Sequence, residues 1–224
     1  MIPFKIVCIN IFWTFMVILL SYVPSVWAQE ANENLQIVDR PIVWNEYREQ
    51  LIREYSQTHY GLTQINIVPQ AVVIHWTAAS TLDSAYWTFY NEARNDGTLN
   101  VASHFLVDRD GTIYRLTSET ALNRHIIGYN WCAIGIENVG GVDGREDLTD
   151  EQLHSNIMLI RYLGKKYTTI KYVFGHYQQD KARESGLYIE NVSGYHSVKI
   201  DPGPVFMNGL RMRLEEDGFS FFYD

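Results

Sequence analysis

The chain has 224 residues, of which 46% are hydrophobic and 20% charged, and its formal net charge at pH 7 is −8. This balance is typical of a globular protein and excludes a disordered or fibrous one. The excess of acidic residues argues against nucleic acid or an anionic membrane surface as a partner.

The first 28 residues differ in composition from the rest. Lys5 precedes an apolar run over Ile11–Leu20, and Val26-Trp27-Ala28 places small residues where a signal peptidase cleaves. We expect residues 1–28 to be a cleavable signal peptide, and hence an exported protein, periplasmic or extracellular, without a stable membrane anchor. An uncleaved anchor is the alternative, but the run is shorter than the roughly 20 residues that span a bilayer. Cleavage would leave 17 basic and 26 acidic residues and Cys132 as the sole cysteine, so no intramolecular disulfide is expected.

Residues 29–65 are predicted to form a polar linker followed by an amphipathic helix, because Trp44, Tyr47, Leu51 and Tyr55 recur at helical spacing. Further along, apolar and alternating runs predict strands, and helical periodicity predicts three more helices. The expected strands are 71–75, 103–107, 112–116, 133–137 and 172–174, and the expected helices are 83–94, 150–163 and 205–216. A tight turn at 108–111 predicts a hairpin, and Thr149-Asp-Glu-Gln152 predicts a capping box. The fold class is therefore α/β, a central mixed β-sheet flanked by helices, in one domain over residues 66–224.

Three polar residues end or directly follow predicted strands: His75, Glu137 and His176. The carboxyl ends of strands are where α/β sheets present their active sites, although each residue alone is also explained by a structural hydrogen bond. Lys199 and Asp201 precede a rigid Pro-Gly-Pro turn and complete the set. Two histidines and a carboxylate make a tetrahedral Zn²⁺ site with one open position, which is the catalytic arrangement. The spacing is weak evidence by itself, since the ligands come from distant segments.

Five motifs in order carry a family resemblance: Val73-Ile-His-Trp-Thr77, Ser103-His-Phe-Leu-Val-Asp-Arg-Asp-Gly-Thr-Ile-Tyr114, Ile134-Gly-Ile-Glu137, Gly175-His176 and Lys199-Ile-Asp-Pro-Gly-Pro204. They resemble the type 2 N-acetylmuramoyl-L-alanine amidases, a family that includes phage amidase lysins and animal peptidoglycan recognition proteins. The resemblance implies a single amidase domain with a central mixed sheet.

It also implies that His75, His176 and Asp201 bind Zn²⁺, and that Glu137 and Lys199 are the catalytic pair. The implied substrate is peptidoglycan or its muropeptides, cut between N-acetylmuramic acid and L-alanine. Glu137 would then transfer a proton to the leaving nitrogen, and Lys199 would stabilise the oxyanion. A surface salt bridge is the alternative role for Lys199.

Four further residues have competing interpretations. His196 lies in the long interval between His176 and Lys199 and competes with His176 as a metal ligand. We favour His176, because His176 follows an apolar strand. Residues 177–195 would be an insertion lining the substrate groove. His104, His125 and Trp76 are candidates for substrate binding, and each is also explained by packing.

Two other functions stay open at this point. One is a non-catalytic peptidoglycan-binding protein of the same fold, which would be expected to lack a metal ligand. The other is a zinc hydrolase of a different class, such as a peptidase or a deacetylase, against which the ordered motifs argue.

Overall fold

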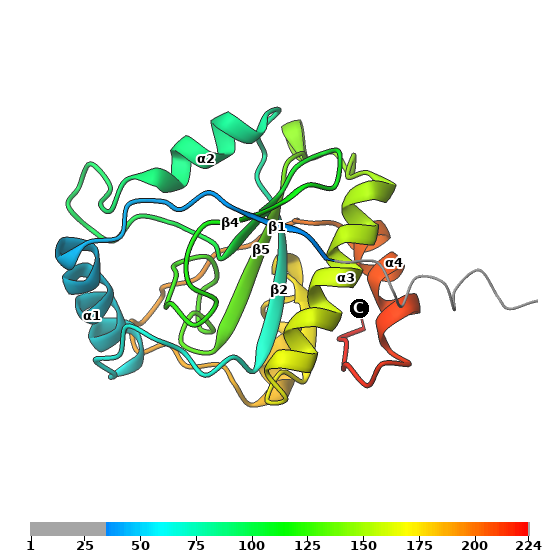
Figure 1. The fold of residues 1–224 in the computed structure, drawn as a ribbon. Coiled ribbons are helices and arrows are strands. Elements are labelled where there is room, and N and C mark those ends of the chain that lie inside the picture. Colours follow the sequence, from blue (N-terminus) through cyan, green and yellow to red (C-terminus); the bar gives the residue numbers. More distant parts are fainter. Residues whose placement is uncertain (1–34, 224) are drawn as a thin grey trace, which may run out of the picture. The chain divides into compact units, whose positions relative to one another are not determined.

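A six-stranded mixed sheet runs through residues 35–223, the part of the chain that the computed structural model describes (Figure 1). The expected signal peptide lies outside the described residues. The strands are β1 (Ile37–Asp39), β2 (Ala71–Trp76), β3 (Phe105–Val107), β4 (Ile113–Arg115), β5 (Ala133–Asn138) and β6 (Tyr172–Gly175). Their order in the sheet is β1-β4-β3-β5-β2-β6. Neighbouring strands are parallel except β3 and β4, which form the predicted hairpin. The predicted fold class, an α/β domain with a mixed sheet, is confirmed.

Side chains of the central strand β2 alternate between the two faces of the sheet, and each face packs against different residues. On β2, Val72 and Ile74 belong to the largest apolar cluster, which also contains buried residues of α3 and α4. Ala71 and Val73 point to the other face, where they pack against Ile126 and Tyr129. Because successive side chains of a strand alternate between faces, His75 lies on the face of Ala71 and Val73. The face that carries His75 is therefore not the face that packs against α3 and α4.

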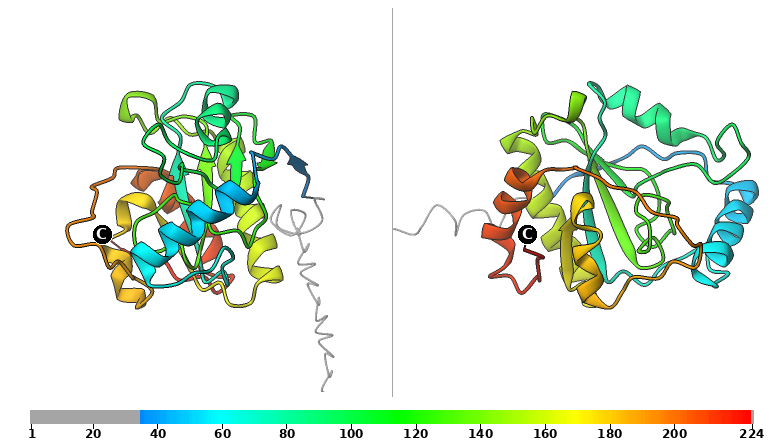
Figure 2. Two further views of the ribbon diagram at one scale, coloured as in Figure 1. Left: turned by 90° about the vertical axis from the view of Figure 1, so that its left-hand side faces the viewer. Right: turned by 180° about the vertical axis from the view of Figure 1, so that it is seen from behind.

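Four α-helices surround the sheet: α1 (Glu46–Tyr60), α2 (Leu82–Tyr90), α3 (Asp150–Lys166) and α4 (Pro204–Leu214). In two views, α3 and α4 lie together on one side of the sheet and α1 lies on the opposite side (Figures 1 and 2). The predicted capping box is confirmed, because Gln152 N donates to Thr149 Oγ1 and Thr149 N donates to Gln152 Oε1. None of the helices in the described part of the chain is long and apolar enough to cross a membrane.

The helix expected at residues 83–94 ends at Tyr90, four residues early. Asn91 is extended, and Ala93 pairs with Leu99 across a turn. The guanidinium of buried Arg48, from α1, donates to the carbonyl oxygens of Phe89, Tyr90 and Asn91. The last carbonyl groups of a helix have no partner within the helix, and at the end of α2 the side chain of Arg48 supplies one. The end of α2 is therefore stabilised by a residue distant in sequence.

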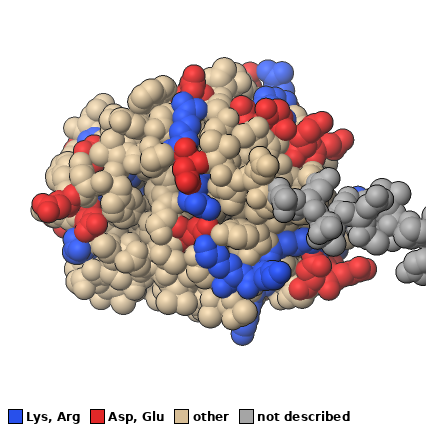
Figure 3. Space-filling view, in the orientation of Figure 1, with Lys and Arg blue, Asp and Glu red and all other residues tan. Residues whose placement is uncertain are grey.

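Acidic and basic side chains are interspersed on the face shown in Figure 3. Ion pairs among the described residues include Arg115–Asp39 at 3.2 Å and Arg161–Asp217 at 2.7 Å. In such pairs a nearby carboxylate locally compensates the charge of the basic group.

Candidate metal centre and active site

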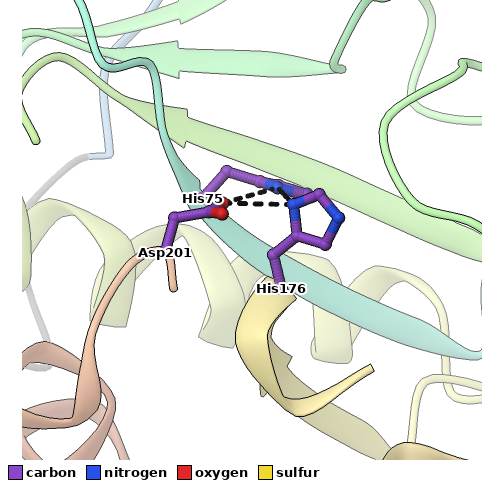
Figure 4. A group of neighbouring side chains, drawn as sticks. All are labelled: His75, His176 and Asp201. Atoms are coloured by element: carbon purple, nitrogen blue, oxygen red, sulfur yellow. Dashed lines mark hydrogen bonds and ion pairs between the residues drawn. The ribbon is translucent and has the colours of Figure 1, made fainter. Parts of the chain in front are cut away.

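His75, His176 and Asp201 meet at the carboxyl end of the sheet (Figure 4). The Nδ1 atoms of His75 and His176 are 3.0 Å apart, and each lies 3.2 Å from Oδ2 of Asp201. All three residues are buried. The donor atoms thus converge on one point, and these residues could hold a metal ion.

Strand register explains why residues far apart in sequence meet here. His75 is the register partner of Glu137 on β5, and Ile74 is the partner of Gly175 on β6. His176 follows Gly175 directly, so parallel pairing brings His75, Glu137 and His176 to the same edge of the sheet. Asp201 arrives from the turn before α4, where Asp201 O accepts from Tyr177 N at 2.9 Å.

Burial and mutual charge set the protonation of the group. Burial and then the neighbouring His176 lower the pKa of His75 to about 4, against the opposing effect of Asp201. Burial opposes ionisation of Asp201, but its interactions with the neighbouring His176 and His75 hold its pKa below the usual range. A neutral imidazole and an ionised carboxylate are the forms that bind a metal.

The donor set fits zinc. Ligand atoms about 2.0 Å from a tetrahedral zinc ion are about 3.3 Å apart, close to the separations of the two nitrogens and the oxygen found here. A zinc ion held by these two histidines and one carboxylate would keep a fourth position for water or substrate.

A cavity of about 350 Å³ opens over the three residues. Glu137 and Lys199 both line it, as do Trp76, Arg124 and His125. Glu137 Oε2 is buried without a hydrogen-bond partner, and burial raises the pKa of this carboxyl well above its usual value, with Asp201 adding to the effect and Lys199 opposing it. A buried carboxyl oxygen without a hydrogen-bond partner, beside three candidate metal ligands, is a candidate proton carrier.

Lys199 is exposed at the rim of this cavity. Within residues 35–223 its amino group forms no ion pair, so the structure does not support the alternative of a surface salt bridge. Its charge is available to a group that enters the cavity.

His125 contacts His75, one of the three candidate metal ligands, through the ring nitrogen of His75 that faces away from the other two. Its Nδ1 lies 3.1 Å from Nε2 of His75, and its Nε2 lies 3.1 Å from the carbonyl oxygen of Ala133. The ring packs against Gly135 on β5, where an added Cβ would come within 2.8 Å of it. The site therefore uses a glycine in a buried strand to admit this ring. Sequence reasoning expected His125 near the substrate and did not foresee its bond to His75.

His104 occupies a different environment. It is fully buried, its Nδ1 accepts from Gly135 N at 2.9 Å, and its Nε2 donates to the carbonyl oxygen of Ala121 at 2.8 Å. Both ring nitrogens are thus used within the fold, and His104 is not among the residues that line the cavity. This arrangement leaves no ring nitrogen of His104 for a substrate.

The competing histidine lies outside the metal group. His196 is exposed, and its Nε2 is 2.9 Å from Oδ2 of Asp180. It is His176, the favoured candidate, whose ring nitrogen joins His75 and Asp201. Residues 177–195 include two short 3-10 helices, η4 (His176–Gln178) and η5 (Lys181–Ser185), and within this insertion Glu190 pairs with His59 of α1 at 2.9 Å.

Three aromatic residues near the site, Trp76, Trp131 and Tyr129, make different contacts. Trp76 lines the cavity, although most of its side chain is buried. Trp131 donates to the carbonyl oxygen of Leu187, and Tyr129 donates to that of Gln179. The latter two therefore support the insertion.

Comparison with known proteins identifies the family. Residues 65–204 match the family Amidase_2, described as N-acetylmuramoyl-L-alanine amidase, which covers more than half of the chain. The chain belongs to this family, which is the type 2 amidase and peptidoglycan recognition protein superfamily.

Individual relatives agree with this placement. The endolysin of Klebsiella phage KP32 is 28% identical over 102 residues, which cover 43% of this chain and 68% of the endolysin. The endolysin of Escherichia phage T7 is 36% identical over 78 residues, 33% of this chain and about half (52%) of the endolysin. Among solved structures, the N-acetylmuramoyl-L-alanine amidase LysC from Clostridium intestinale URNW superposes with a TM-score of 0.53 at 22% identity, covering 81% of this chain and 99% of that one. This last likeness establishes the fold.

Proposed function

We propose that the protein is a zinc-dependent N-acetylmuramoyl-L-alanine amidase, which hydrolyses the amide bond between N-acetylmuramic acid and L-alanine in peptidoglycan or its muropeptides. The observation that carries this proposal is the convergence of His75 Nδ1, His176 Nδ1 and Asp201 Oδ2 within 3.2 Å of one another beside Glu137. Membership of the amidase family supports the substrate class.

His75, His176 and Asp201 would hold the zinc ion. Zinc bound there would act as a Lewis acid on the scissile carbonyl and lower the pKa of a water molecule. Asp201 would supply a negative ligand, and the two neutral imidazoles would leave the site with a net positive charge that attracts the carbonyl oxygen.

Glu137 would move the proton. Its partly buried carboxylate has a raised pKa, which makes Glu137 a stronger base than an exposed glutamate. It would take a proton from the attacking water and deliver it to the nitrogen of the departing L-alanine. Lys199, a cation at the rim that forms no ion pair within residues 35–223, would stabilise the negative charge that develops on the carbonyl oxygen.

The test is a digest of purified peptidoglycan with and without a zinc chelator, with the released products identified by mass spectrometry and bound metal counted. We expect stem peptides beginning in L-alanine, their loss on chelation and their return when zinc is restored. Release of acetate or of internal peptide fragments would indicate a hydrolase of another class. Zinc binding without any product would indicate the non-catalytic binding protein instead.

We also propose that residues 1–28 are removed on export and that residues 66–224 form the catalytic domain. The composition of the first 28 residues supports this. Expression of the whole chain in a bacterium, fractionation of the cell and mass measurement of the product would test it. A mature chain that begins at Gln29 outside the cytoplasm is the expected result, and a full-length chain in the cytoplasm would contradict it.

A further inference from the structure

Asp201 differs from the two candidate histidine ligands in the segment that precedes it. The histidines lie at the ends of β2 and β6, whereas residues 196–200 form neither helix nor strand. Val198 and Ile200 in this segment are exposed, so the segment is not anchored in the core by its large apolar side chains. The position of Asp201 therefore depends on the contacts made by the turn at residues 201–204 and by α4.

The turn that contains Asp201 is held from two sides. On one side, Asp201 O accepts from Tyr177 N at 2.9 Å. On the other side, Glu146 Oε2 accepts from Val205 N, in the first turn of α4, at 2.9 Å. Glu146 belongs to the loop between β5 and α3, which contributes none of the three candidate ligands. The contact therefore ties the turn to a separate part of the chain.

Gly203 leaves room for Glu146 at the start of α4. It is the N-cap residue, its φ is 88°, and it has no side chain that could accept from the first turn of the helix. A Cβ at this position would overlap the side chain of Glu146. The N-cap residue of a helix usually supplies the acceptor itself. Here a carboxylate from a distant loop takes that role, and its negative charge is favourable beside the N-terminus of the helix.

We propose that Glu146 is a positioning residue for the metal centre, because its bond to Val205 N fixes the turn that presents Asp201 to His75 and His176. The inference rests on the proposed zinc site. Asp201 Oδ2 lies 3.2 Å from Nδ1 of each histidine, and all three donor atoms must keep such distances to hold one ion. A loosened turn would spread Asp201 over several positions, and the apparent metal affinity falls with the fraction that is competent to bind. Glu146 is not among the residues that line the metal cavity, so it would act through the backbone of the turn.

The experiment measures the zinc affinity of Glu146→Ala and of the unmodified protein by competition with a chromophoric chelator. We expect the affinity of the variant to fall about threefold to thirtyfold, the factor that corresponds to the loss of one capping hydrogen bond. Glu146→Gln should retain most of the affinity, because its amide oxygen can still accept from Val205 N. Glu46→Ala is the matched control, since Glu46 is likewise an exposed glutamate but lies in the first turn of α1, which carries no candidate ligand. It should leave the affinity unchanged.

Unchanged zinc affinity in Glu146→Ala overturns the inference, even if this variant unfolds at a lower urea concentration, because Glu146 would then only stabilise α4. If the unmodified protein binds no zinc, the proposed function fails, and amide hydrogen exchange in the metal-free protein decides about Glu146. The amide to follow is that of Tyr177, which donates to Asp201 O. Exchange about threefold or more faster in Glu146→Ala, and not in Glu46→Ala, would show that Glu146 holds the turn. Equal exchange in both variants would overturn the inference.

Discussion

The Nε2 atom of His75 lies 3.1 Å from Nδ1 of His125, and this contact sets which nitrogen of His75 carries a proton. The carbonyl oxygen of Ala133 only accepts, so the Nε2 atom of His125 facing it is the donor. Nδ1 of a neutral His125 is then an acceptor, and His75 donates from Nε2. The lone pair of His75 Nδ1 is left pointing toward His176 and Asp201, as a zinc ligand requires.

Removing this acceptor should weaken the metal site. We expect His125→Leu to lower zinc affinity about tenfold to a hundredfold, because the tautomer of His75 is no longer selected. His125→Asn should retain most of the affinity, since an amide oxygen can take the place of Nδ1. Competition with a chromophoric chelator measures the affinity, and nitrogen NMR of the metal-free protein reports the tautomer. Equal zinc affinity in the leucine variant and the unmodified protein would contradict the argument.

Substitutions of Glu137 and Asp201 should have different effects, the first on the rate of hydrolysis and the second on metal binding. Glu137→Gln removes the proton carrier and leaves the three donor atoms in place, so kcat should fall about a hundredfold to ten-thousandfold while zinc content stays stoichiometric. Asp201→Asn removes the negative ligand, so zinc itself should be lost. Parallel measurement of muropeptide cleavage and bound metal distinguishes the two effects. Loss of zinc in Glu137→Gln would mean that this residue also supports the metal.

Arg48 should contribute strongly to stability although it lies far from the chemistry. Its buried guanidinium donates to the carbonyl oxygens of Phe89, Tyr90 and Asn91, and Arg48→Met would remove all three hydrogen bonds from a buried position. We expect the free energy of unfolding in urea to fall by about 2 to 4 kcal/mol. Arg53→Met, at an exposed position of the same helix, should change it by no more than about 0.5 kcal/mol. A similar loss in both variants would show that any change in α1 is destabilising.

Glu119 should make stability depend on acid pH. Burial alone would raise its pKa, but Lys166, Tyr167 and Tyr162 bind the carboxylate and the net pKa is lowered. A carboxyl with a lower pKa in the folded state stabilises the protein above its unfolded pKa, and this contribution is lost as the pH falls through the folded value. The difference in unfolding free energy between the unmodified protein and Glu119→Gln should therefore be larger at pH 7 than at pH 3.

The control for this measurement is Glu184→Gln, which removes an exposed partner of Lys181. Exposed ion pairs contribute little, so this variant should track the unmodified protein at both pH values. A pH-independent difference for Glu119→Gln would assign its effect to packing.

The two candidate histidine ligands were accessible to sequence reasoning because they lie at the ends of apolar strands whose carboxyl ends meet. His75 is the penultimate residue of β2 and His176 directly follows β6, and short apolar runs are a strong local signal. The capping box at Thr149 was accessible for the same reason, since both of its partners lie within one turn. Local chemistry of this kind is readable in a single sequence.

Contacts that depend on chain path were not accessible. His125 sits in an irregular segment, and no periodicity indicates that its ring packs on Gly135 and reaches His75. The edge strand β1 has three residues, too few for an alternating pattern, and pairs with β4 alone. Arginine is usually found at the surface, so the sequence does not predict that Arg48 is buried. Its burial is explained only by the carbonyl groups that the fold places around its guanidinium.

The alternation along β2 has a consequence for how this protein tolerates change. Val72 and Ile74 belong to the apolar cluster that includes α3 and α4, whereas His75 faces the cavity, so the same strand serves two sides that share no side chains. Substitutions on the cavity side can change reactivity while the helical layer remains intact. We therefore expect exchange of a catalytic group on the cavity side to disturb the packing of α3 and α4 less than exchange of Val72 or Ile74 would.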